Sequence, residues 1–245
     1  MKSPGAYAKA RILALVAALE KYHQFQETDS LHRIRVEIKK YKTLLLVLGF
    51  ADRKFDAHEH YLPLRNIFRK AGQIRQPSVM LELMMANRLE GLPVERLGNV
   101  GKARDRFRAD TPFFMTEIAK LGKRMKPRWK KLRRKDITGY IKATRKQVKI
   151  ALVPRLKPAQ LHTTRKRVKQ LIYLGRLSRR LDAKELRFYK DLDAAIGTLH
   201  DKESLLEFLL SLPRRAVTTP IRLLRRQIAD DRKAVAALAG RQYAG

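Results

Sequence analysis

The stretch LHRIRVEIKKYKTLL, from Leu31 to Leu45, recurs as LHTTRKRVKQLIYLG from Leu161 to Gly175, at an offset of 130 residues. Apolar residues in both copies recur at the spacing of one face of an α-helix. The pairs that coincide are Leu31 and Leu161, His32 and His162, Arg35 and Arg165, Ile38 and Val168, and Lys39 and Lys169. A repeat of this kind predicts two copies of one helical unit.

Helical spacing extends over most of the chain, and few stretches alternate as a half-buried strand would. We therefore expect an all-α fold. The expected helices are 6–26, 29–49, 58–73, 77–90, 101–126, 137–152, 159–181, 184–198, 201–212 and 219–239. Residues typical of helix caps stand at three of the starts, namely Asp29-Ser30 before Leu31, Asp182 before the helix at Lys184, and Thr218-Thr219-Pro220 before Ile221.

The helices on either side of the repeated stretch also match, 6–26 with 137–152 and 58–73 with 184–198. The sequence thus predicts two helical repeats, 1–133 and 134–245. Because no Gly/Ser tract joins them, we expect two pseudosymmetric helical bundles, related by internal duplication and packed into one compact body.

A row of cations lies beside the apolar face in each copy. The first basic row comprises His32, Arg35, Lys39 and Lys42, and the second comprises His162, Arg165 and Lys169. Like charges one turn apart destabilise a helix by about 0.2–0.5 kcal/mol per pair, and neither row contains an acidic residue. An anionic ligand would offset this cost, so we expect the rows to line an anion-binding groove. A solvated run of charge is the alternative.

The composition of the 245-residue chain also points to a polyanionic partner. Lys and Arg number 56 against 23 Asp and Glu, a net charge of +33. With 44% hydrophobic residues the chain can bury a core, and without Cys it has no disulfide or thiolate–metal site. The best apolar runs, Ile12–Leu19 and Leu44–Ala51, are too short to cross a membrane. We expect a soluble, cytoplasmic protein.

The segments LHRIRVEIKKYK and LHTTRKRVKQLIY resemble the signature helices of CHAD domains (conserved histidine α-helical domains). IRQPSVMLEL at Ile74–Leu83 and LHDKESLLEF at Leu199–Phe208 are similar to the second recurring segment of that family. The resemblance covers essentially the whole chain, and its most specific part is the duplicated His-x-x-Arg-x-x-x-Lys. It implies two helical bundles whose basic residues line a central surface or pore. It also implies binding of inorganic polyphosphate without catalysis. Our leading hypothesis is a module that scaffolds or targets to polyphosphate, with granules as one location.

The resemblance assigns all residues of both basic rows to polyphosphate binding. Further candidates are Lys40 and Lys166 beside the rows, and Arg104, Arg108, Arg222 and Arg226 near the start of the last long helix of each half. Two departures predict weaker binding in the second half: Gln76 stands where the second copy has Asp201, and Ile172 stands opposite Lys42. We expect the row histidines to gain a proton when phosphate binds, so that binding tightens as the pH falls from about 8 to 6.

Two other functions stay open. A sequence-independent RNA- or DNA-binding protein would carry the same charge, and nucleic acid is the expected competitor. Aromatic residues, which stack on bases, make up only 7% of the chain. A polyphosphate-metabolising enzyme, or its regulatory subunit, would need carboxylates that hold a divalent metal beside the cations, and the sequence lacks such a motif.

We expect no metal and no cofactor. The segment 56–60 (DAHEH) holds two histidines at i,i+2, which point to different faces of a helix. The densest basic segment, 120–135 (KLGKRMKPRWKKLRRK), has two interpretations, a second polyanion contact or a solvated connection, because its Pro and Gly weaken a helix.

Overall fold

The computed structural model describes residues 3–89, 92, 100–152, 158–178 and 180–243. Within these ranges the chain forms α-helices and no strand, which confirms the all-α prediction. The helices are α1 (Pro4–Phe25), α2 (Thr28–Ala51), α3 (Ala57–Ala86), α4 (Gly101–Lys131), α5 (Arg134–Leu152), α6 (Pro158–Ser178), α7 (Ala183–Leu210) and α8 (Arg214–Tyr243). None of the described helices carries an apolar stretch long enough to span a bilayer.

Two pairs of expected helices form single helices, 58–73 with 77–90 in α3 and 184–198 with 201–212 in α7. The break expected near Pro77 is therefore wrong, although proline removes one backbone donor from a helix. Met80 and Met84, beyond the proline, are buried and one turn apart. Burial of an apolar face supplies most of the stability of a helix in a protein, so it outweighs the lost hydrogen bond.

The helix starts agree with the expected caps in one case. Asp182 caps α7, because its side chain accepts a hydrogen bond from the backbone N–H of Glu185. The expected cap at 218–220 is wrong, since α8 begins earlier, at Arg214. The expected cap at 29–30 is also wrong, because these residues lie within the first turn of α2.

The helices pack into two compact units. The first comprises residues 1–79 and 94–140, and the second comprises residues 80–93 and 141–245. The repeats expected at 1–133 and 134–245 stay predictions, as do the internal duplication and the pseudosymmetry.

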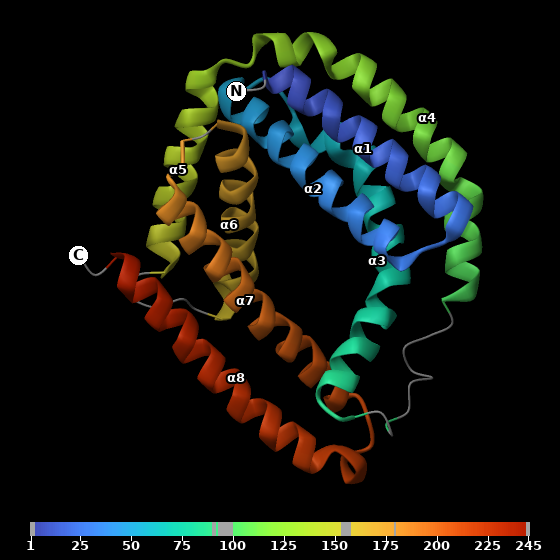
Figure 1. Cartoon of the computed structure of the whole chain (residues 1–245), viewed down its shortest axis with the longest axis vertical. Helices are drawn as coiled ribbons and strands as arrows, with labels where there is room; N and C mark the ends of the chain where they lie inside the picture. The colour runs from blue at the N-terminus through green and yellow to red at the C-terminus, as the bar shows by residue number, and fades with distance from the viewer. Residues whose placement is uncertain (1–2, 90–91, 93–99, 153–157, 179, 244–245) are drawn as a thin grey trace. The chain divides into compact units, whose positions relative to one another are not determined.

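In the first unit α1 lies between α2 and α4 (Figure 1). Leu19 and Tyr22 of α1 are fully buried, and the Tyr22 ring packs edge-on against Phe107 of α4 with the ring centroids 5.2 Å apart. Ile34 and Ile38 of α2 are likewise fully buried. This core fixes α2 by its apolar face, so the first basic row lies on the flank of a well-anchored helix.

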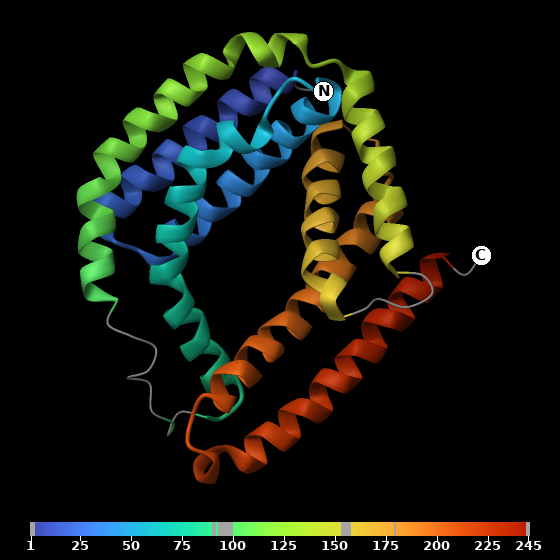
Figure 2. The same ribbon diagram turned by 180° about the vertical axis from the view of Figure 1, so that it is seen from behind.

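In the second unit α7 lies between α6 and α8 (Figure 2). Val168 of α6 and Ile196 of α7 are fully buried. On its other side α7 is joined to α8 by an ion pair of 2.8 Å between Lys202 and Asp231. The second basic row thus lies on a helix that packs directly on α7.

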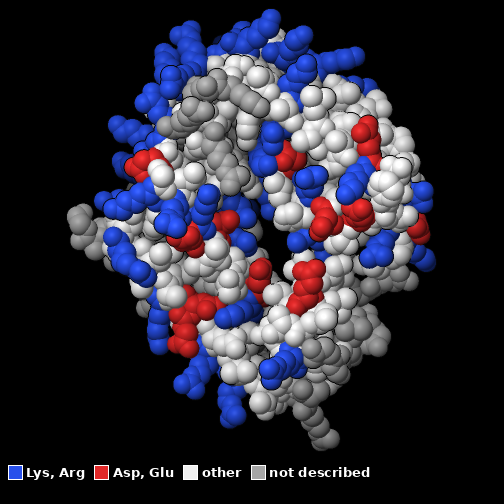
Figure 3. Space-filling model, viewed as in Figure 1, with Lys and Arg blue, Asp and Glu red and all other residues white. Residues whose placement is uncertain are grey.

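The basic segment 120–135 is helical as far as Lys131, so the weakening expected from its Gly and Pro is not observed. Met125 and Trp129 are buried one turn apart, and the Trp129 ring lies edge-on to Tyr41 of α2 with the ring centroids 5.6 Å apart. Lys and Arg side chains gather over this end of α4, as Figure 3 shows. Apolar anchors on one face therefore hold the helix and direct its cations to solvent.

Candidate anion-binding site

The first basic row lies against α3. Arg35 donates a hydrogen bond of 2.7 Å from Nη1 to the backbone carbonyl of Phe68, and its guanidinium lies 3.9 Å from the centroid of the Phe68 ring. The Lys39 ammonium lies 5.7 Å from the centroid of the same ring, and the Lys42 ammonium lies 4.1 Å from that of Tyr61. Cations over aromatic faces are attracted without losing their charge. The contacts described here therefore leave all three side chains charged.

Gly72 makes room for the arginine of this row. A Cβ atom at this position would lie 2.2 Å from Nη1 of Arg35, which is closer than any van der Waals contact. Any other residue here would push the guanidinium away from the Phe68 carbonyl. The glycine is thus a local requirement for the position that Arg35 adopts.

Burial and a neighbouring cation both disfavour the charged form of the Arg35 guanidinium. Burial lowers the pKa of its guanidinium, and the neighbouring Arg75 lowers it further. Among the described residues no carboxylate forms an ion pair with Arg35. A half-buried cation beside another cation raises the local potential, so an anion that reached Arg35 would be bound strongly.

The second basic row lies against α7 and has a different partner. Asp193 accepts from Arg165, with 3.4 Å between Nε and Oδ1, and its Oδ2 lies 3.3 Å from Nζ of Lys169. A Cβ atom at Gly197 would lie 2.9 Å from Nη2 of Arg165. Each unit therefore places the arginine of its basic row against a glycine of the next helix.

Histidines differ between the two rows. His32 is exposed at the start of the first row. His162 starts the second row, and its ring lies 5.7 Å from the ring of His200 on α7. Arg75 follows Gly72 at the distance in sequence at which His200 follows Gly197. The second unit thus has an imidazole where the first has a permanent cation.

Ile172 of α6 is buried, with 6% of its surface exposed. It occupies the position that corresponds to Lys42, which is only half-buried and lies over Tyr61. In the second unit this position belongs to the apolar core. The second row therefore ends one cation earlier.

Several residues at this site were not found from the sequence: Phe68, Tyr61, Gly72, Arg75, Asp193, Gly197 and His200. The row helices contribute no acidic residue to either row, but Asp193 reaches the second row from α7. The sequence nevertheless contains a signal for two of these partners. Gly72 and Gly197 stand at equivalent places in AGQIR and IGTLH, and the residues one turn before them, Phe68 and Asp193, face the arginines.

The remaining candidate residues lie away from these contacts. Lys40 is paired with the buried carboxylate of Glu37, which also binds Arg11 of α1 at 2.8 Å. Arg108 lies at the α1–α4 contact, where its backbone carbonyl is 3.1 Å from Nδ1 of His23, and Arg104 is close enough to Tyr22 to act on its hydroxyl. Lys166, Arg222 and Arg226 are exposed.

The DAHEH segment acts as a helix start. The Asp56 carboxylate accepts hydrogen bonds from the backbone N–H groups of His58 and Glu59, and these bonds lower its pKa. The ring of His60 stacks on Phe55 with the centroids 4.7 Å apart. Among the described residues no three His, Asp or Glu side chains are grouped as metal ligands.

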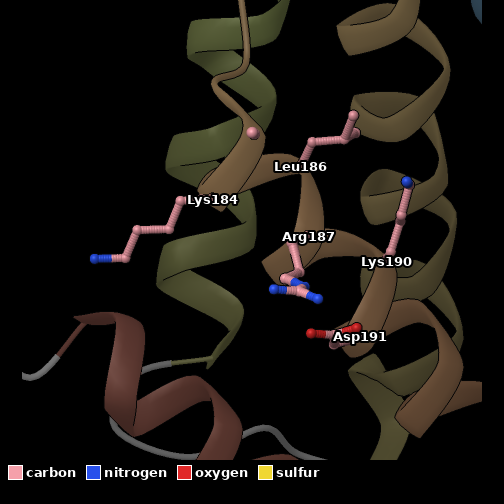
Figure 4. A pocket seen from close by; sticks show the side chains of 6 residues that line it. Lys184, Leu186, Arg187, Lys190 and Asp191 are labelled. Carbon is pink, nitrogen blue, oxygen red and sulfur yellow. The ribbon is translucent and has the colours of Figure 1, made fainter.

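A hollow of about 540 Å³ lies beside the first turns of α7. Its lining comprises Ala183, Lys184, Leu186, Arg187, Lys190 and Asp191. Figure 4 shows that the labelled side chains all come from this helix, with Lys184 directed away from Lys190. No residue of the second basic row lines this hollow, so it is distinct from the Asp193 contacts.

Comparison with models of known protein families, with curated proteins and with solved structures found no match to this chain. The interpretation of the two rows therefore rests on their own geometry and chemistry.

Proposed function

We propose that this protein binds inorganic polyphosphate through its two basic rows and does not cleave it. The resemblance to CHAD domains, a cytoplasmic location and targeting to polyphosphate granules are parts of the same proposal. The observation that carries it is Arg35, a desolvated cation that lies beside Arg75 and has no carboxylate partner among the described residues. Such a residue costs stability in the free protein and gains most from an anion.

The form of the first row suits a chain of phosphates. Its residues follow one face of α2 over about 15 Å, at a rise of about 1.5 Å per residue. Arg offers a fork of donors that matches phosphate oxygens, and Lys offers a point charge that can adjust. A linear run of negative groups can therefore meet several cations at once.

The aromatic residues of the site favour a ligand without bases. Proteins that bind single-stranded nucleic acid present aromatic faces on which bases stack. Here the Phe68 ring is covered by Arg35, and the Tyr61 ring faces Lys42. These rings pack against cations of the protein instead of bases. The backbone charge of the ligand is then the feature that the site recognises.

The decisive test is competition between long-chain polyphosphate, duplex DNA and structured RNA at one stated salt concentration. We expect polyphosphate to displace both nucleic acids at equal charge concentration. The opposite order would overturn the proposal in favour of a nucleic-acid-binding protein. Phosphate release in the presence of Mg²⁺, Mn²⁺ or Zn²⁺ would overturn the absence of catalysis.

Arg35→Ala combined with Arg165→Ala tests the two rows directly. We expect the double variant to remain folded, to lose polyphosphate affinity by about tenfold or more, and to show a weaker salt dependence. Arg69→Ala with Arg225→Ala is the matched control, because it removes two exposed arginines outside the rows. Equal losses in both double variants would show that total charge, and not the rows, governs binding.

A further inference from the structure

Asp193 lies between the two cations of the second basic row. Its two carboxylate oxygens are divided between them, Oδ1 toward Arg165 and Oδ2 toward Lys169. The three side chains are 22–25% exposed, so the cluster is partly shielded and still reached by solvent. Phe68 occupies the equivalent place in the first unit, one turn before the glycine that faces the arginine.

Both contacts of Asp193 are long. Charge-assisted hydrogen bonds between nitrogen and carboxylate oxygen are typically about 2.7–2.9 Å, whereas these two measure 3.4 Å and 3.3 Å. Ion pairs with solvent access contribute little, because water and salt screen them. The carboxylate therefore reduces the charge of the second row without holding either cation tightly.

A pair of histidine rings lies on the same two helices as the Asp193 contacts. His162 lies on α6 in the same row, and His200 lies close to it on α7. A carboxylate that contacts two cations is in the position that a phosphate group would take. Its single charge is less than that of a condensed phosphate.

We propose that Asp193 is an internal counter-ion that occupies the anion position of the second basic row and must be displaced when a condensed phosphate binds there. The inference rests on the proposed function. Displacement weakens the second row relative to the first, where Arg35 forms no ion pair with a carboxylate of the described residues. It also favours ligands with several adjacent charges, because these replace both contacts at once.

Asp193→Asn removes the competing charge and keeps the shape of the side chain. Binding is measured with tripolyphosphate on the full-length protein, by following the NMR signal of the Arg165 Nε–H group, which is assigned by its loss in Arg165→Lys. We expect Asp193→Asn to lower the apparent dissociation constant of this signal by about three- to tenfold, since a weak internal ion pair no longer competes.

Asp231→Asn is the matched control. Asp231 also pairs with a lysine of α7, its side chain is 25% exposed, and its loss raises the net charge by the same amount. If Asp193→Asn binds no more tightly than Asp231→Asn, the inference is overturned. Weaker binding would overturn it as well, because Asp193 would then position the two cations for the ligand.

Two further measurements keep the inference falsifiable. If Asp193→Asn does not fold, as judged by circular dichroism, Asp193→Ser supplies the same comparison. In the wild-type protein the Arg165 Nε–H signal must shift when tripolyphosphate saturates it, and an unchanged signal would overturn the inference. Displacement of polyphosphate by duplex DNA overturns the proposed function alone, because the comparison of Asp193→Asn with Asp231→Asn is made with tripolyphosphate.

Discussion

The two basic rows share one order of His, Arg and Lys, yet they lie against different surfaces. Arg35 of the first row lies over the ring of Phe68, whereas Arg165 of the second lies beside the carboxylate of Asp193. An aromatic face attracts a cation through its quadrupole and leaves the charge in place, while a carboxylate cancels part of it. We therefore expect Arg35 to offer an outside anion a larger positive potential than Arg165 does.

This difference arises on the facing helix and not on the row itself. Phe68 and Asp193 occupy equivalent places before Gly72 and Gly197, and both glycines admit an arginine. The arginine of each row thus meets a glycine in the same way, and the residue one turn before that glycine changes the charge beside it. Similar rows need not bind equally well.

The largest expected effect is the difference in polyphosphate affinity between Arg35→Ala and Arg165→Ala. Arg35→Ala should lower polyphosphate affinity by about tenfold or more, because a charged hydrogen bond with phosphate is lost from an arginine that forms no ion pair with a carboxylate of the described residues. Arg165→Ala should lower it by about threefold, since Asp193 already neutralises part of its charge. Isothermal titration at one salt concentration measures both.

Arg225→Ala, which removes an exposed arginine of α8, is the single-charge control for this comparison. A loss in Arg165→Ala that equals or exceeds the loss in Arg35→Ala would break the proposed ranking of the two rows. Circular dichroism of each variant ensures that unfolding does not account for the difference.

The all-α class and the positions of the row helices could be predicted from the sequence, because apolar periodicity determines which face of a helix is buried. Ile34 and Ile38 are buried as their spacing indicates, and His32 on the opposite flank is exposed. Helix ends were less predictable. Pro77 carries a local signal for a break, but buried side chains beyond it continue α3.

The partners of the rows could not be predicted from one helix at a time. A helical wheel shows which residues of α2 share a face, but it does not show that Phe68 of α3 meets Arg35. The pairing of Asp193 with a cation agrees with the general expectation that isolated carboxylates of a basic chain form salt bridges. Which cation it meets depends on the packing of α6 on α7.

An intermediate effect on polyphosphate binding is expected when Gly72 or Gly197 is replaced by alanine. Alanine is favoured over glycine inside a helix by up to about 1 kcal/mol, so Gly72→Ala should not lower the free energy of unfolding if the Arg35 guanidinium swings aside. Its displacement should weaken polyphosphate binding by about threefold. Gly197→Ala should have a smaller effect on binding, because its Cβ would approach Arg165 to 2.9 Å instead of the 2.2 Å found at Gly72.

Gly240→Ala in α8 is the control, since a Cβ atom there would meet nothing within 4 Å. Urea unfolding and titration with polyphosphate are measured on all three variants. If Gly72→Ala loses stability and affinity together, the glycine serves helix packing, and its link to the position of Arg35 is wrong.

The smallest expected effect is the change in stability on acidification, which has opposite signs in the two units. In the first unit, burial and then Arg124 and Arg128 lower the pKa of His60, so the folded state resists protonation and loses stability as the pH falls below the ordinary histidine range. In the second, burial raises the pKa of Glu185, so the folded state accepts a proton more readily and gains stability as the pH falls toward the ordinary glutamate range.

Hydrogen exchange resolves the two units within one chain, and comparison of each variant with wild type at the same pH removes the intrinsic pH dependence of exchange. On acidification from about pH 7 to 5, His60→Gln should lose less protection in α3 than wild type, because the group that resists protonation is gone. Glu185→Gln should gain less protection in α7 than wild type, because the glutamine side chain is neutral throughout. Equal responses of wild type and variants in both units would mean that self-repulsion of the +33 charge, and not these two groups, governs acid stability.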